Sequence, residues 1–291
     1  MDFAIDDHKL IYHPHRVVDL LNSGRDWYKH KNLEPIYAEV STSGSCNHRC
    51  TFCSVDYIGY KSIFLSLSTL KSFIDGCKDI GLKSIMFAGD GEPLLNPNIG
   101  EVVEYAYQSG IDISFTTNGV HLKHEFIDNH IHKISWIKVS LNAGTPDDYK
   151  RIHRTNSSDF EKVWNNLDYA VKFKGSDPTV TTAIGAQSLI LPDNINSLDA
   201  LLARAKDTGL DYVVLKPYVH NVYMQQPGYH DIDYTEAIYT NTITSLKQKY
   251  DSPSFTVVAR FNALDKLVGN QPRYSKCWST PALWFYVSGN G

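Results

Sequence analysis

Residues 36–53 read IYAEVSTSGSCNHRCTFC, and the predicted fold begins with this stretch. Its first part, residues 36–41, has the β-branched and aromatic character of a strand. Three cysteines follow directly, at positions 46, 50 and 53, with the spacing C-x3-C-x2-C. A loop with such close spacing lets three thiolates converge, and cysteine thiolates are the usual ligands of iron–sulfur clusters.

Beyond this stretch, short β-branched runs alternate with longer helical patterns, which is typical of βα units around a parallel sheet. The helical patterns cover residues 67–80, 160–173, 195–206 and 234–249. The expected strands are 36–41, 84–88, 111–116, 136–141, 181–191, 212–216 and 255–260. We therefore predict an α/β fold, a partial (βα)6 TIM-like barrel with a short C-terminal extension. In such folds the active face lies at the carboxyl ends of the strands.

The composition is that of a globular protein, with 291 residues, 42% hydrophobic and 21% charged, and a net charge of −4. There is no block of lysine and arginine, so we expect no nucleic-acid partner. There is no run of about 18 apolar residues and no signal peptide, so we expect a cytoplasmic protein without a membrane partner. Five cysteines in such a chain are typical of thiols or metal ligands rather than disulfides.

The cysteine triplet resembles the signature of the radical S-adenosylmethionine (radical SAM) superfamily, in which an aromatic residue precedes the third cysteine, as Phe52 does here. The resemblance implies that Cys46, Cys50 and Cys53 hold a [4Fe–4S] cluster. Its fourth iron then binds the amino and carboxylate groups of S-adenosyl-L-methionine (SAM). In the family, an electron from the cluster cleaves SAM to methionine and a 5′-deoxyadenosyl radical. An open coordination position distinguishes a reactive metal site from a structural one.

A structural zinc site formed by the three cysteines and His48 is the alternative, and it would make the protein a non-enzymatic metal-binding module. His48 lies only two residues after Cys46, which places it poorly to complete a tetrahedron with all three sulfurs. Zinc sites also favour paired C-x2-C spacings. The spacing therefore favours the cluster.

A glycine-containing turn follows the second expected strand. Residues 88–93 read AGDGEP and resemble the family's Gly-Gly-Glu-Pro element, which implies that Gly89, Gly91 and Glu92 lie against the cofactor. Glycine permits such a close approach because it has no Cβ. Asp90 departs from the family pattern, which more often has glycine there. An ordinary βα turn is the alternative, since glycine and proline mark turns in general.

Later strand ends supply the other cofactor contacts that the resemblance implies. Asn118 ends the third strand, Ser140 ends the fourth, and Leu189 lies on the fifth, where the family packs adenine. Arg151 or Arg154, three apart on one helix face, is expected to bind a carboxylate, because a guanidinium suits bidentate binding. A turn, a core strand and a solvated helix charge explain the same residues without a ligand.

The substrate site is predicted from the end of the sixth strand. Lys216, Tyr218 and His220 are candidates for substrate contact there, with a polar strand end as the alternative. Cys77 lies on an apolar helix face and is expected in the core. The resemblance also implies an external electron donor, such as flavodoxin or ferredoxin.

The end of the chain resembles the opening of a SPASM or twitch extension, in which a cysteine precedes a strand and a glycine-marked turn. The resemblance implies that Cys277 is the first ligand of an auxiliary [4Fe–4S] cluster, if the full-length protein continues. A free thiol on a C-terminal strand is the alternative. We expect three segments: residues 1–33 as a helical lead-in, 34–225 as the radical SAM core, and 226–291 as a C-terminal helix and an incomplete SPASM-like segment.

The resemblance implies an enzyme whose radical abstracts hydrogen from a substrate. A peptide maturase should recognise a leader segment through an added domain, and residues 1–33 look too short for one. We therefore expect a small molecule, such as a sugar or nucleoside, with a peptide or protein maturase as the alternative.

Overall fold

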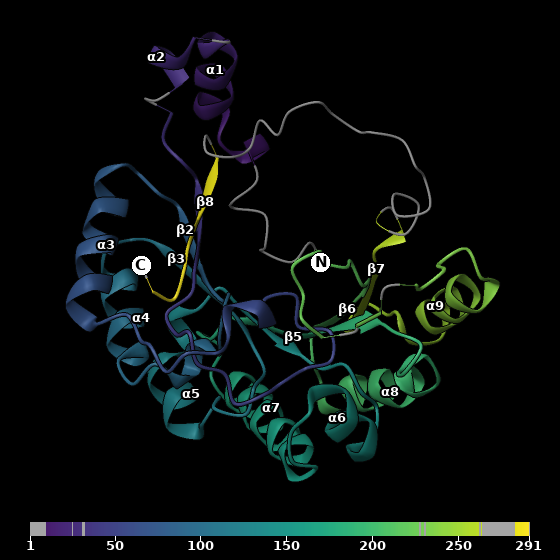
Figure 1. Ribbon diagram of the computed structural model, residues 1–291. Coiled ribbons are helices and arrows are strands. Elements are labelled where there is room, and N and C mark those ends of the chain that lie inside the picture. The colour runs from purple at the N-terminus through teal and green to yellow at the C-terminus, as the bar shows by residue number, and fades with distance from the viewer. Residues whose placement is uncertain are drawn as a thin grey trace.

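A parallel eight-stranded sheet forms the centre of the protein, with the strand order β7-β6-β5-β4-β3-β2-β1-β8 (Figure 1). The computed structural model describes residues 10–24, 26–30, 33–226, 228–229, 231–261, 263 and 283–290. The strands are β1 (Tyr37–Val40), β2 (Ser84–Phe87), β3 (Asp112–Thr117), β4 (Trp136–Ser140), β5 (Ala183–Ile190), β6 (Tyr212–Pro217), β7 (Thr256–Ala259) and β8 (Trp284–Val287). The predicted α/β partial barrel is confirmed.

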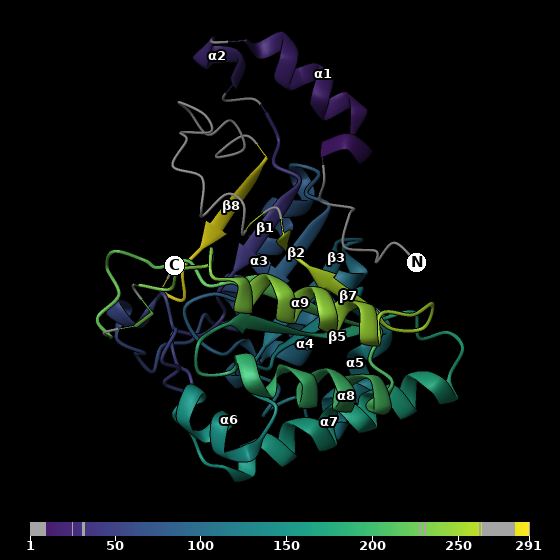
Figure 2. The same cartoon turned by 90° about the vertical axis from the view of Figure 1, so that its right-hand side faces the viewer.

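Helices cover the outer, convex face of the curved sheet, and α1 and α2 lie beyond one end of it (Figures 1 and 2). Side chains such as Ile74, Leu167 and Leu202 are fully buried between helices and sheet. The helices are α1 (Pro14–Ser23), α2 (Trp27–His30), α3 (Leu67–Asp79), α4 (Ile99–Gln108), α5 (His124–His130), α6 (Pro146–His153), α7 (Ser158–Ser176), α8 (Leu198–Thr208) and α9 (Ala237–Tyr250).

Local sequence explains where these helices begin and end. The side chain of Ser66 accepts a hydrogen bond from the backbone of Thr69 and so caps α3. Thr145 caps α6 in the same way, and Pro146 occupies its first turn. Gly209 ends α8 in the left-handed conformation, at φ 88°. None of the described helices has the length and apolar character that a membrane crossing requires.

The sheet continues beyond the six predicted βα units. β7 pairs in parallel with β6, and β8 pairs in parallel with β1, from Tyr37 opposite Trp284 to Val40 opposite Val287. The strand near the end of the chain therefore belongs to the same sheet as the first strand, and the two edges of the sheet are β7 and β8.

The inner face of the sheet differs from the outer one. Along β1, Ala38 and Val40 are fully buried, whereas Tyr37 and Glu39 are only half-buried. Side chains alternate between the two faces of a strand, so the half-buried set shares the inner face. Parallel sheets are usually buried on both faces. The half-buried inner face is therefore the candidate location of a ligand-binding site.

Candidate active site

The inner face of the sheet and the loops at its carboxyl edge enclose a cavity of about 770 Å³. A second hollow of about 580 Å³ shares Lys138, Gln187 and Lys216 with it and reaches Glu39 and Asp90. The predicted residues that line the larger cavity are Cys46, Cys50, Phe52, Cys53, Gly89, Gly91, Glu92, Asn118, Ser140, Leu189, Lys216 and Tyr218. The fold thus brings together one loop and five strand ends.

The loop that carries the three cysteines, residues 43–53, is called the cysteine loop, and it is held in place by the end of α6. The backbone N–H of Arg49 donates to the carbonyl of His153 at 3.1 Å, and the N–H of Thr51 donates to the carbonyl of Ile152 at 2.9 Å. All three cysteines of the loop are half-buried free thiols. The loop therefore presents its sulfurs to the cavity from a fixed backbone.

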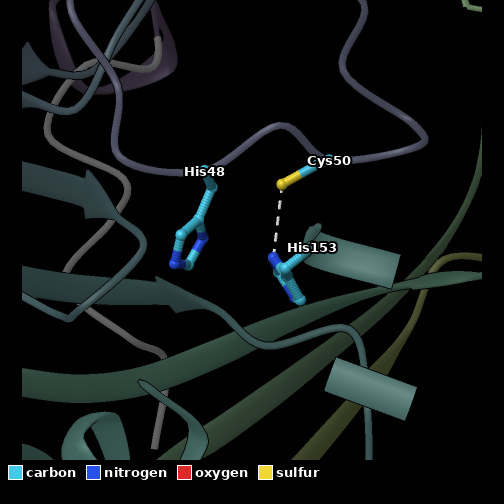
Figure 3. A group of neighbouring side chains, drawn as sticks. All are labelled: His48, Cys50 and His153. Atoms are coloured by element: carbon cyan, nitrogen blue, oxygen red, sulfur yellow. Dashed lines mark hydrogen bonds between the residues drawn. The ribbon is translucent and has the colours of Figure 1, made fainter. Parts of the chain in front are cut away.

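Two of the three sulfurs have a hydrogen-bond donor beside them within the described residues. The backbone N–H of His48 donates to Cys46 Sγ at 3.4 Å. Figure 3 shows Cys50 Sγ facing Nδ1 of His153, at 3.3 Å.

The tautomer of His153 follows from its other ring nitrogen. Nε2 accepts a hydrogen bond from the backbone N–H of Asn142 at 3.2 Å. Burial holds the pKa of His153 well below its ordinary value, so the ring is neutral. The single ring proton therefore lies on Nδ1 and is donated to Cys50.

The three thiols of the cysteine loop fit an iron–sulfur cluster as ligands. Burial raises the pKa of Cys46 to about 12 and that of Cys50 well above its ordinary value, so thiolates here need a compensating positive charge. A single zinc ion at about 2.3 Å from each ligand would bring the sulfurs within about 4 Å of one another. Within the described residues, the group of at least three such ligand atoms that all lie within 4.8 Å of one another is instead that of His48, Cys50 and His153. A cluster with several irons spreads its thiolates more widely than one ion does.

The group of His48, Cys50 and His153 is a poor site for a single ion. His153 already uses both ring nitrogens in hydrogen bonds, to Cys50 and to the backbone of Asn142. His48 is 1% exposed, and its ring packs edge-on against those of Tyr149 and His153. The two imidazoles therefore pack and orient the loop.

Glycine is required where the turn after β2 meets the cysteine loop. A Cβ on Gly91 would lie 2.3 Å from the carbonyl oxygen of Ser45 and 2.4 Å from that of Ser43. Gly89 has φ +113°, and a Cβ there would lie 2.5 Å from the hydroxyl of Tyr286. The turn therefore forms a backbone shelf directly against the cysteine loop.

Glu92 joins this shelf to the end of β3. Its buried carboxylate accepts hydrogen bonds from the backbone N–H groups of Leu94 and Asn118, at 3.1 and 2.7 Å, and from the hydroxyl of Thr117 at 2.5 Å. Burial raises the pKa of Glu92 to about 7. Asn118 in turn donates to Asn47 at 2.7 Å, so three loops are tied together beside the cysteines.

Asp90, which departs from the family pattern, has a clear partner in the structure. Its carboxylate accepts hydrogen bonds from the hydroxyl of Tyr286, from Ser288 Oγ at 2.7 Å and from the backbone N–H of Gly289 at 2.8 Å. A glycine at position 90 would supply none of these bonds. Asp90 therefore attaches the end of β8 to the shelf.

The predicted arginines lie outside the cavity lining. Arg151 is exposed and pairs with Asp148 and Asp193, at 2.8 and 2.9 Å. Arg154 is exposed at the end of α6, with φ 47°, and donates to Gln226 at 2.5 Å. Binding of a carboxylate by either one stays a prediction.

Another predicted residue, His220, is not among the described residues that line the cavity. His220 Nδ1 lies 3.4 Å from the hydroxyl of Tyr218, a residue that does line the cavity. Cys277 lies outside the described residues. Contact of His220 with a substrate, and of Cys277 with an auxiliary cluster, stay predictions.

Several lining residues were not predicted from the sequence. Lys138 lies two residues before Ser140 on β4. The period of two along a strand puts this pair on one face, and this signal alone would have found Lys138. His153, Asn142 and Arg260 also line the cavity, and for these the sequence offers no comparable pattern.

Comparison with protein families gives one match over the core. Residues 40–187, half of the chain, match the model of the Radical SAM superfamily. The chain is 32% identical to GTP 3′,8-cyclase of Desulforamulus reducens over 144 residues, which cover 47% of this chain and 43% of that enzyme. It is 30% identical to the S-adenosylmethionine-dependent nucleotide dehydratase of Flammeovirga pacifica over 127 residues, covering 42% and 43%. The matches span less than half of the length of these relatives.

Solved structures share the fold over more of the chain. The structure of Streptococcus suis SuiB bound to S-adenosylmethionine has a TM-score of 0.70 and covers 97% of this chain and 63% of its own, at 14% identity. The structure of anSMEcpe with bound AdoMet has a TM-score of 0.59 and covers 78% and 64%, at 17% identity. At this level of identity the likeness concerns the fold.

Proposed function

This chain belongs to the radical SAM superfamily, and from that premise we propose that it is the core of an enzyme that cleaves SAM reductively and abstracts hydrogen from a small-molecule substrate. The family implies a [4Fe–4S] cluster and SAM as cofactors. One observation carries the proposal: the three thiols of the cysteine loop open into the same cavity as the glycine shelf at residues 89–92.

Different residues of the chain would bind the cluster and SAM. Cys46, Cys50 and Cys53 would hold the cluster. The cluster and SAM, when bound, supply a one-electron reduction that generates a hydrogen-abstracting radical. Gly89 and Gly91 line the cavity in which the amino-acid part of SAM would bind. Both are glycine because a Cβ would collide with the cysteine loop at Gly91 and with Ser41 and Tyr286 at Gly89.

The remaining walls orient the ligands and exclude water. The ring of Phe52 packs edge-on against His153, at 5.6 Å between centroids, and covers one side of the cysteine loop. Leu189 offers an apolar surface, while Ser140 and Asn142 offer polar atoms beside it. An apolar wall with a few placed polar groups is typical of cofactor sites. It also protects a reactive species from side reactions.

The small-molecule substrate is supported by the sequence relatives. The two relatives named above carry names that refer to GTP and to nucleotides, and they match this chain over 144 and 127 residues. The likeness to SuiB concerns the fold alone, so it gives no support to a peptide substrate. A nucleotide or a related phosphorylated metabolite is therefore the substrate class that we propose.

Anaerobic reconstitution with iron and sulfide, followed by an assay for 5′-deoxyadenosine, tests the proposal. With SAM and a chemical reductant, we expect release of 5′-deoxyadenosine by the unaltered chain and none by Cys50→Ala. Cys77→Ala is the matched control, because Cys77 is a 3% exposed core thiol on α3, away from the cavity. It should retain both its iron and its release of product.

Two outcomes would reject the enzymatic proposal. One is equal release of 5′-deoxyadenosine by the unaltered chain and Cys50→Ala. The other is purification with one zinc ion per chain that anaerobic iron and sulfide cannot replace, which would favour a structural metal site.

A further inference from the structure

The inner face of the sheet carries a group of basic side chains, of which only Lys216 was predicted to contact a ligand. Lys138 of β4 and Lys216 of β6 line both hollows, and Arg260, directly after β7, lines the larger one. The described lining of the smaller hollow contains none of the three cysteines of the loop. This group, Lys138, Lys216 and Arg260, is called the basic cluster below.

Acidic side chains only partly balance the basic cluster. Glu39 of β1 and Asp90 are the carboxylates in the described lining of the smaller hollow, and Glu92 is the carboxylate in that of the larger one. Asp90 is already engaged by Tyr286, Ser288 and Gly289. Glu92 is likewise engaged, by Leu94, Thr117 and Asn118. Among the residues that the structure describes, neither lysine of the cluster has an ion pair with an acid. Three positive charges therefore face one available carboxylate.

The charge of the basic cluster destabilises the folded protein unless a bound anion offsets it. Burial lowers the pKa of both lysines, and Arg260 lowers both further. Lys216 also lowers the pKa of Lys138, while Glu39 raises the pKa of each lysine. An unpaired charge in a partly dry cavity opposes folding. Apolar side chains at these inner-face positions would avoid that cost. A bound anion would also offset it.

The space allows a second ligand beside SAM. Ligand pockets typically have volumes of about 300–1,000 Å³. The two hollows, of about 770 and 580 Å³, each fall in that range, and they meet along Lys138, Gln187 and Lys216. A molecule in the smaller hollow can therefore present a carbon atom to the larger one.

We propose that the basic cluster is the subsite for a doubly charged anionic group of the substrate, namely a phosphate ester. The inference rests on the proposed function, because the substrate must share the cavity with SAM. Three cations against Glu39 leave an excess of two charges, which matches a phosphate monoester at about −1.5 to −2 and exceeds a single carboxylate. Glu39 and Gln187 then remain to bind hydroxyl or amide groups of the same molecule.

Calorimetric titration of the reconstituted protein with inorganic phosphate tests the subsite, with acetate as a singly charged probe. We expect phosphate to bind more tightly than acetate, and Lys138→Gln and Lys216→Gln each to weaken phosphate binding by about tenfold or more. Lys216→Arg keeps the charge and should largely retain binding. Lys150→Gln, on the exposed face of α6, is the matched control and should bind phosphate like the unaltered chain.

Binding of SAM, measured on the same variants, separates the competing explanations. If the two glutamine variants lose affinity for SAM and keep that for phosphate, the lysines bind the carboxylate of SAM and the proposal is overturned. Equal affinity of the unaltered chain for phosphate and acetate also overturns it. Release of 5′-deoxyadenosine by the unaltered chain without substrate reports on the proposed function separately. Failure of one proposal is therefore distinct from failure of the other.

Discussion

At the scale of single residues, the hydrogen bond from His153 to Cys50 gives the clearest prediction. We expect His153→Phe to shift the cluster potential to more negative values, because a donor to a cluster sulfur stabilises the reduced, more negative state. The shift should be tens of millivolts, since about 1.4 kcal/mol corresponds to about 59 mV for one electron. A redox titration followed by electron paramagnetic resonance measures it.

His48→Phe is the matched control for this prediction. The ring of His48 lies 5.3 Å from that of His153, and neither of its nitrogens makes a hydrogen bond within the described part of the chain. The potential of this variant should stay close to that of the unaltered protein. A shift of equal size in both variants would show that local polarity, rather than the bond to Cys50, sets the potential.

At the scale of elements, the attachment of β8 to the shelf depends on one carboxylate. Asp90→Ala removes three hydrogen bonds that join the turn after β2 to Tyr286, Ser288 and Gly289. We expect the local stability of β8 to fall by about 1–3 kcal/mol, because hydrogen bonds to a charged group are worth that much when buried. Hydrogen–deuterium exchange at residues 284–289 should accelerate accordingly.

Asp128→Ala is the control at this scale. Asp128 also accepts a hydrogen bond from a tyrosine, Tyr169, at 2.7 Å, but this pair is exposed and joins two helices on the outer face. Its loss should leave exchange in β8 unchanged. If Asp90→Ala leaves exchange there unchanged as well, pairing with β1 alone holds β8 in the sheet.

At the scale of the whole molecule, we expect the basic cluster to lower the free energy of unfolding of the ligand-free protein. We expect Lys138→Met to increase the free energy of unfolding at neutral pH by about 2 kcal/mol, because it removes a buried cation that makes no ion pair within the described residues and that Lys216 and Arg260 repel. Attraction by Glu39 and the contact of Lys138 Nζ with the ring of Trp136, at 5.2 Å, offset only part of that cost. The groups that face Lys138 are Lys216, Arg260 and Glu39. Thermal unfolding of the ligand-free variant and of the unaltered chain measures the difference.

The gain from Lys138→Met should depend on pH with a definite sign. Burial lowers the pKa of Lys138 from 10.5 to about 8 in the folded protein. The unfolded chain therefore holds this proton more tightly, and the cost of the folded charge is fully present below about pH 8. It declines as the pH rises from about 8 to 10.5, so the two unfolding curves should converge there. A constant difference across that range would contradict the assignment, and Lys150→Met should show none.

The fold class, most strand positions and the loop with the three thiols can be predicted from the order of amino acids alone. These depend on local physics: the period of two in strands, the 3.6-residue period in helices such as α3, and the close spacing of cysteines on one loop. The glycines of the AGDGEP turn are visible in the sequence, but the contacts that exclude a Cβ there are tertiary, from the segment after β1 and from Tyr286.

Contacts between residues that are distant in the sequence depend on the tertiary structure. His153 reaches Cys50, and Asp90 reaches the end of β8, because parallel strands bring their carboxyl ends to one edge whatever their separation in the chain. The basic cluster arises in the same way, from strands β4, β6 and β7 that curve around one cavity. Sequence patterns report the face on which a side chain lies, whereas the curvature and order of the strands determine what it faces.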